Sequence, residues 1–115
     1  VSLAISKSLN PATVEENGAV TYTFLIQNFG STEATAADDI IFRDTFNPIL
    51  TNLKAEFNGA TWDKNTNYTY STSTGEFTSL TGQITVPAAT YTQNPTTGAW
   101  SVQPGVSTLV ITGNI

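Results

Sequence analysis

The sequence contains no cysteine, no methionine and no histidine among its 115 residues. Without cysteine there is no disulfide framework, no thiolate zinc site and no cysteine nucleophile. Without histidine there is no Ser-His-Asp triad and no histidine-ligated metal. A turnover enzyme would need paired carboxylates, and no spacing in the chain suggests them. We therefore expect a protein that is not an enzyme and that needs no cofactor or metal.

Charged residues and long apolar runs are also scarce. Only 11% of residues are charged, and 4 Lys and Arg against 9 Asp and Glu give a net charge of -5. This is the wrong sign for binding nucleic acid or an anionic membrane. No apolar run approaches the roughly 18 residues of a membrane span. The sequence predicts neither a nucleic-acid partner nor a membrane span.

The length is that of one domain, residues 1–115. No basic-then-apolar leader opens the chain. Both ends look cut to a domain boundary, which predicts a single domain taken from a larger repeat protein.

Alternation of apolar residues with period two dominates, as expected for half-buried strands. The alternating rows are Leu3-Ile5-Lys7-Leu9, Val20-Tyr22-Phe24-Ile26, Ile40-Phe42-Asp44-Phe46, Leu53-Ala55-Phe57, Tyr68-Tyr70, Ile84-Val86 and Trp100-Val102, before the last run at 107–112. Asn58-Gly59 predicts a type I′ hairpin turn. Strands at such spacing predict an all-β fold, a β-sandwich of about 7–9 strands; the resemblance described below specifies its topology as Ig-like Greek-key.

Other turn signals separate these rows, among them Asn10-Pro11 and Asn17-Gly18. The segment from Thr32 to Asp38 is the only helix candidate. It is short and Ala-rich, and a loop fits it equally well.

Two charged residues occupy positions where the pattern expects apolar ones. Lys7 lies in the first row, and Asp44 lies between Phe42 and Phe46. A buried lone charge costs several kcal/mol, so such residues are usually paired or neutral. Asn114 ends the last strand, and the first and last strands of a sandwich are often neighbours. Lys7, Asp44 and Asn114 could therefore meet in the core.

These three residue types can form an intramolecular amide. Burial favours the neutral amine of a lysine, which is a nucleophile, and the protonated form of a carboxyl group. Protonated Asp44 would polarise the Asn114 carbonyl, and the Lys7 amine would attack it and expel ammonia. The isopeptide bond forms once, so this is self-processing rather than turnover. It would join the first strand to the last and take up load when the termini are pulled.

Simpler roles remain open for each of the three. Lys7 can extend along the sandwich edge with only its stem buried. Asp44 can accept backbone N–H bonds before Asn47-Pro48, and Asn114 can be a polar residue at a strand end.

The position of Asn114 also raises a difficulty. Strict alternation puts it on the face of Val110 and Thr112, unless that row faces the core or a bulge at Gly113 shifts the register. Asn28 is a rival acceptor for Lys7, although Asn28-Phe29-Gly30 favours a turn role.

The order of several short motifs resembles a bacterial surface repeat known as domain of unknown function eleven. The matching segments are Lys7-Ser8-Leu9-Asn10-Pro11, Gly18, Val20-Thr21-Tyr22-Thr23, Asn28-Phe29-Gly30, Phe42-Arg43-Asp44-Thr45-Phe46, Thr96-Thr97-Gly98-Ala99-Trp100, Pro104-Gly105 and Leu109-Val110-Ile111-Thr112-Gly113. The resemblance spans nearly the whole chain, and its specificity lies in the order and spacing of the motifs.

This resemblance implies an Ig-like sandwich in a secreted or wall-anchored bacterial protein, with neighbouring repeat domains as partners. The family is similar to the collagen-adhesin and pilin domains that form internal isopeptides. Carried over, Lys7 is the amine, Asp44 the catalytic acid and Asn114 the acceptor. Many members lack the final Asn, and this chain has Phe46-Asn47-Pro48 where members often have Leu-Pro after Asp-Thr. The implied function is a stalk or spacer module on the cell surface.

The alternative function is a module that binds a glycan or a host protein through loops and aromatics. The candidate aromatic residues are Trp62, Tyr68, Tyr70, Tyr91 and Trp100. Aromatics at strand spacing are also typical of a core.

A third kind of site rests on acidic residues. Asp38-Asp39 together with Glu33 could bind a hard cation such as calcium. A solvated acidic loop explains the same residues.

Overall fold

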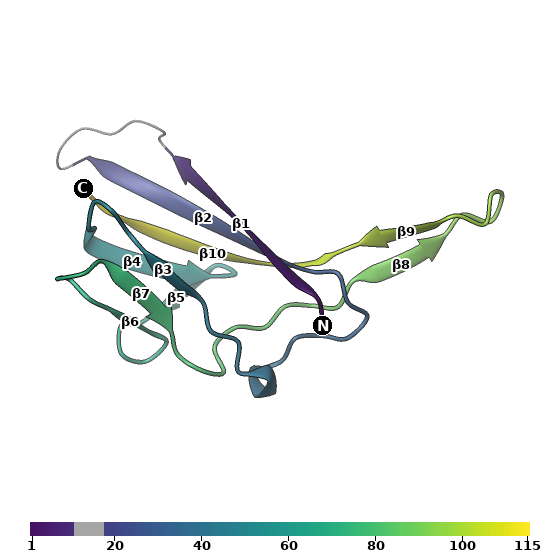
Figure 1. The fold of residues 1–115 in the computed structure, drawn as a ribbon, viewed down its shortest axis with the longest axis horizontal. Helices are drawn as coiled ribbons and strands as arrows, with labels where there is room; N and C mark the ends of the chain where they lie inside the picture. Colours follow the sequence, from purple (N-terminus) through teal and green to yellow (C-terminus); the bar gives the residue numbers. More distant parts are fainter. Residues whose placement is uncertain (11–17) are drawn as a thin grey trace.

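The protein is all-β in a computed structural model that describes residues 1–10 and 18–115. Ten strands form antiparallel sheets, and the described residues contain no α-helix (Figure 1). Accordingly, none of the described segments is a helix that could span a membrane. The turns predicted at Asn10-Pro11 and Asn17-Gly18 fall on or against residues 11–17, outside the described residues.

The largest sheet has five strands in the order β1-β2-β10-β4-β5. Their bounds are Leu3–Asn10 (β1), Ala19–Asn28 (β2), Gly105–Asn114 (β10), Thr51–Phe57 (β4) and Ala60–Trp62 (β5). β2 pairs antiparallel with β1 on one side, over its residues 21–28, and with β10 on the other, over its residues 19–28. β1 and β10 therefore run parallel to each other on opposite sides of β2.

The predicted type I′ hairpin is present between β4 and β5. Phe57 lies opposite Ala60, so Asn58 and Gly59 form the whole turn. Both have positive φ, 50° at Asn58 and 84° at Gly59, as this turn requires.

A second sheet has three strands in the order β3-β7-β6. Their bounds are Arg43–Thr45 (β3), Glu76–Ser79 (β7) and Tyr68–Tyr70 (β6). The row predicted from Ile40 to Phe46 is thus a strand only at its centre. A short 3-10 helix, η1 (Ala36–Asp38), lies within the helix candidate at 32–38.

Side chains of the two sheets form one hydrophobic core. Tyr22 and Phe24 on β2 contact Phe46 and Phe42, with ring centroids 4.8 and 4.6 Å apart. The buried apolar residues are Val20, Tyr22, Phe24, Ile26, Ala34, Phe42, Phe46, Leu50, Ala55, Phe57, Trp62, Tyr68, Tyr70, Phe77, Ile84, Val86, Leu109 and Ile111. Most of the predicted rows are therefore core rows, as expected for period-two strands.

The first row behaves differently from the others. Leu3, Ile5 and Leu9 lie on the core side of β1, but all three are exposed. β1 is the edge strand of its sheet, and the three-stranded sheet does not cover this row fully. Burial of the row was expected from its alternation, which carries no information about position within a sheet.

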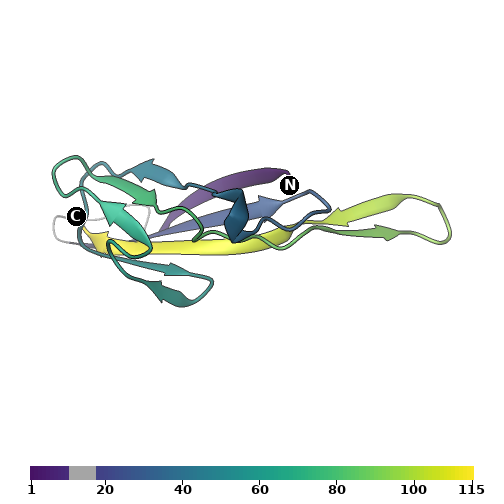
Figure 2. The ribbon, with the colours of Figure 1, turned by 90° about the horizontal axis from the view of Figure 1, so that it is seen from below.

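The remaining two strands form an arm. β8 (Thr90–Gln93) and β9 (Trp100–Gln103) form a two-stranded sheet without a third partner among the described strands, and all eight residues are exposed. The molecule measures 56 × 33 × 21 Å with the arm included. The arm extends along the long axis beyond the two larger sheets (Figures 1 and 2).

Candidate functional site

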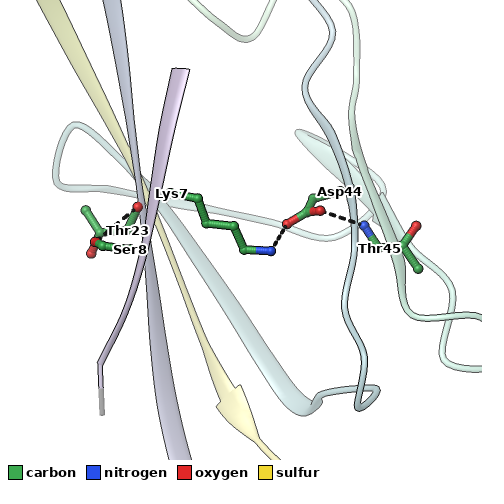
Figure 3. Close-up of polar contacts among 5 residues, drawn as sticks. All are labelled: Lys7, Ser8, Thr23, Asp44 and Thr45. Carbon is green, nitrogen blue, oxygen red and sulfur yellow. Dashed lines mark hydrogen bonds and ion pairs between the residues drawn. The ribbon is translucent and has the colours of Figure 1, made fainter. Parts of the chain in front are cut away.

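Lys7 and Asp44 meet between the two sheets. Lys7 lies opposite the buried Phe24 in the β1–β2 register, which directs its side chain to the core face. Asp44 lies on β3, opposite Phe77. Lys7 Nζ is 2.7 Å from Asp44 Oδ2, so the pair links the edge strand of one sheet to the other sheet (Figure 3).

The Asp44 carboxylate is held at both oxygens. Its Oδ1 accepts a hydrogen bond of 3.0 Å from the Thr45 backbone N–H. Its Oδ2 is buried and lies against the Lys7 ammonium group, its polar partner among the described residues. One of the simpler roles considered for Asp44, acceptance of a backbone N–H, therefore coexists with the ion pair.

Three aromatic rings surround the lysine ammonium. Lys7 Nζ lies 4.9 Å from the ring centre of Tyr22, 5.7 Å from that of Phe24 and 5.6 Å from that of Phe46. These distances fall within the range of cation–π attraction. The rings were expected only as core residues. The one sequence signal for their second role is the lysine in the apolar row that faces them.

The site is not dry, contrary to what the isopeptide chemistry requires. The Lys7 side chain is 44% exposed and the Asp44 side chain 25% exposed. A groove of about 340 Å³ opens beside them, lined in part by Ile5, Ile41 and Arg43. The described arrangement therefore supports an ion pair in which Lys7 Nζ lies over the three rings.

The structure does not bring Asn114 to this pair. Asn114 lies opposite the exposed Ala19, whereas Lys7 lies opposite Phe24. The two side chains are thus on opposite faces of the sheet and five residues apart along β2, roughly 16 Å at about 3.3 Å per residue. Asn52 Nδ2 donates to Asn114 Oδ1 over 3.4 Å.

The bulge considered at Gly113 does not change this placement. A register shift between Thr112 and Asn114 occurs in the pairing with β4. The pairing with β2 continues without a break, and Gly113 stays on the core face opposite Val20. Asn114 keeps the outer face that strict alternation gives it.

Asn28 has the turn role that its sequence context favoured. It is fully buried, and its Oδ1 accepts hydrogen bonds from the N–H groups of Gly30 and Ser2. Its Nδ2 donates to the Thr32 carbonyl over 2.8 Å. All of these bonds lie at the far end of β2 from Ala19.

The acidic candidates for a cation site do not gather. Glu33, Asp38 and Asp39 form no group of metal-ligand geometry within the described residues. The Asp38 carboxylate instead accepts a hydrogen bond of 2.7 Å from the Thr35 N–H. It caps the 3-10 helix.

The five aromatic candidates for a binding surface divide into two groups. Trp62, Tyr68 and Tyr70 are buried in the core, whereas Tyr91 and Trp100 are exposed on the arm.

Comparison with known proteins returns no relative: no protein-family model, no curated protein and no solved structure matches the chain.

Proposed function

We propose that this domain is a mechanical spacer in a bacterial surface protein or fibre, positioned outside the cell with neighbouring repeat domains on either side. In this proposal the two packed sheets form an Ig-like Greek-key β-sandwich. The motif order described above supports the assignment, as does the shared aromatic core of the two sheets.

The observation that carries the proposal is the arrangement of β1 and β10 about β2. The start of β1 lies at one end of the sheet, where Leu3 faces Asn28. The end of β10 lies at the other, where Asn114 faces Ala19. Hydrogen bonds between antiparallel strands run perpendicular to the strands. Tension along the strands therefore loads all the hydrogen bonds between neighbouring strands at once instead of breaking them one by one.

The Lys7–Asp44 pair adds to this resistance. β1 is an edge strand, and β2 is the one strand paired with it among residues 1–10 and 18–115. Its core-side row is exposed, so apolar burial holds it weakly. An ion pair of 2.7 Å to β3 fixes it to the second sheet near its middle.

Single-molecule force spectroscopy tests the proposal. Because the chain has no cysteine, handles can be attached at introduced cysteines. Handles at residues 1 and 115 pull in the shearing direction. Handles at S2C and F29C, which adjoin each other through the Phe29 N–H to Ser2 carbonyl bond, peel β1 from β2. We expect a severalfold higher unfolding force in the first geometry; equal forces would refute the mechanical role.

The covalent Lys7–Asn114 bond stays a prediction from the sequence, because the described arrangement separates the two side chains. Intact mass measurement decides it. The ion-paired form has the mass of the sequence, whereas amide formation at Asn114 lowers the mass by one ammonia. A direct Lys7–Asp44 amide lowers it by one water. A loss of mass that disappears in Lys7→Ala would establish a cross-link at Lys7. An unchanged mass would mean that Lys7 forms the ion pair and no covalent bond.

A further inference from the structure

The arm formed by β8 and β9 has two chemically different faces. In its register Tyr91 lies opposite Val102, and Gln93 lies opposite Trp100. Cross-strand partners share a face, so these four side chains lie together. The opposite face carries only hydroxyl and amide side chains: Thr90, Thr92, Ser101 and Gln103.

The first face, here called the aromatic face (Tyr91, Gln93, Trp100 and Val102), is open to solvent. Trp100 is 66% exposed and Tyr91 47% exposed. Tyr91 and Trp100 occupy diagonal positions on neighbouring strands, and residues in such positions are roughly 7–8 Å apart. Trp62 is buried, so Trp100 is the exposed tryptophan of the chain.

The arm is ordered by its own hydrogen bonds. Asn94 Oδ1 accepts from the N–H groups of Thr96 and Thr97, and the Gly98 N–H donates to the Asn94 carbonyl. At the base, the Tyr91 hydroxyl donates to the Phe29 carbonyl. These bonds give the arm a defined conformation in the native state, and a surface that is already ordered loses less entropy when it binds.

The arm itself carries no charged side chain. All thirteen charged side chains of the chain lie at or before Glu76, so the segment from Phe77 to Ile115 has none. A ligand of this face is therefore held by stacking on the rings and by hydrogen bonds to amides and hydroxyls. A neutral sugar offers this combination, because a pyranose ring has an apolar C–H face and a rim of hydroxyl groups.

The size of the face favours a small ligand over a protein. A tryptophan or tyrosine buries about 150–250 Å² at most. Two half-exposed rings, one valine and one glutamine fall well short of the roughly 800 Å² per partner of a standard protein interface. A second copy of the chain would gain too little from this surface alone.

We propose that the aromatic face binds a neutral oligosaccharide, with Trp100 and Tyr91 stacking on pyranose rings and Gln93 Oε1 accepting a hydrogen bond from a sugar hydroxyl, since Gln93 Nε2 donates to the Gly98 carbonyl. This site is separate from the strands that bear tension in the proposed spacer. The arm would hold the glycan away from the body of the domain.

Tryptophan fluorescence tests this proposal, because the buried Trp62 and the exposed Trp100 emit differently. Cellohexaose, chitohexaose and maltohexaose are the neutral probes, with heparin as a charged comparison. We expect at least one of the neutral probes to shift the Trp100 emission to shorter wavelength. Trp100→Ala should weaken binding at least tenfold by isothermal titration calorimetry, roughly the loss of one stacking contact.

Ser101→Ala is the matched control, because Ser101 neighbours Trp100 but lies on the other face of the arm. Its affinity should equal that of the parent. The proposal is overturned if no neutral oligosaccharide binds, if Trp100→Ala binds as well as Ser101→Ala, or if heparin binds better than the neutral probes. Concentration-dependent dimerisation that Trp100→Ala abolishes, without sugar binding, would assign the face to a second copy and would also overturn it.

Discussion

At the scale of single residues, the Lys7–Asp44 pair shows how a charged side chain can lie against the aromatic core. Its lysine is 44% exposed, so solvent screens much of the attraction. Exposed ion pairs typically contribute about 0.2–1 kcal/mol. The three rings below Nζ add a cation–π contribution that does not depend on the carboxylate. The pair and the rings should therefore be separable by substitution.

A double-mutant cycle with Lys7→Met and Asp44→Asn measures this separation by urea unfolding. We expect a coupling free energy of up to about 1 kcal/mol between the two side chains. Lys54→Met, on the exposed side of β4, is the control and should change the free energy of unfolding by less than about 0.5 kcal/mol. Zero coupling would mean that the ion pair contributes nothing to fixing β1.

Tyr70 makes a second residue-scale contact that ties the sheet to a loop. Its hydroxyl donates to the Leu50 carbonyl over 2.8 Å and accepts from the Leu50 N–H over 3.0 Å. Both residues are buried. Tyr70→Phe leaves two buried backbone groups of Leu50 without this partner. We expect a loss of about 1–3 kcal/mol in the free energy of unfolding at neutral pH.

The same tyrosine predicts a fall in stability at alkaline pH. Burial raises the pKa of Tyr70 above its ordinary 10.0, and the hydrogen bond with Leu50 opposes this rise. The unfolded state therefore loses the phenolic proton first. The stabilising contribution is complete below about pH 10 and is lost as pH rises through the folded pKa.

Urea midpoints measured between about pH 9 and pH 11 check this prediction. The midpoint should fall with pH more steeply in the parent than in Tyr70→Phe. Burial also raises the pKa of Tyr68, with the nearby Asp63 adding to the rise, so Tyr68→Phe should flatten the profile too. Equal slopes in parent and variants would contradict the assignment.

At the scale of elements, the start of β10 depends on a close backbone approach. A Cβ built on Gly105 would lie 1.8 Å from the Pro87 carbonyl oxygen and 2.9 Å from that of Ala88. No side chain fits there without moving the backbone. Because Gly105 has no side chain, the backbone at Pro87 and Ala88, which leads into β8, can pass directly against the start of β10.

Gly105→Ala should therefore lower the free energy of unfolding by at least about 2 kcal/mol. Gly59→Ala is the control: its φ is +84°, and its Cβ would meet nothing within 4 Å. The control should lose only the roughly 1–2 kcal/mol of a left-handed backbone position. Thermal unfolding of both variants measures the difference, and an equal or smaller loss at Gly105 would contradict the close approach.

Elements with a strong apolar alternation were predictable, and those without it were not. Val20 to Ile26 predicted β2, and Asn58-Gly59 predicted the β4–β5 turn. β7 and β8 had no such signal, because each has a single aromatic residue among Thr, Ser, Gln or Glu. The row Ile84-Val86 alternates but forms only an isolated bridge from Val86 to Ala34. Ile84 and Val86 are both buried without being part of a strand, so burial in a loop gives the same apolar alternation as a strand.

At the scale of the whole molecule, stability is distributed unevenly along the long axis. β2 has a partner strand on each side and a buried row facing the core. Within the part of the chain that the structure describes, the arm has neither a third strand nor a buried residue in its two strands. Two-stranded ribbons are marginal by themselves. The body of the molecule is thus expected to be more stable against local unfolding than the arm.

Native-state hydrogen exchange checks this distribution. Amides of β2 should exchange near the rate of global unfolding, and those of the arm at least roughly two orders of magnitude faster. β1 should be intermediate, because it is an edge strand. Protection of the arm equal to that of β2 would mean that it is covered in solution.

The sequence by itself determined the all-β class, the core rows and the chemical types of the candidate site, since periodicity and residue chemistry are local properties. It also predicted that Lys7 pairs with an acidic side chain, because a charged residue in an apolar row needs a partner of opposite charge. The tertiary structure alone decided which strands are neighbours. That choice put β2 between β1 and β10, left Asn114 on the outer face, and exposed Tyr91 and Trp100 while burying Trp62. Strand order is set by contacts between residues far apart in the chain, and alternation along one strand does not encode it.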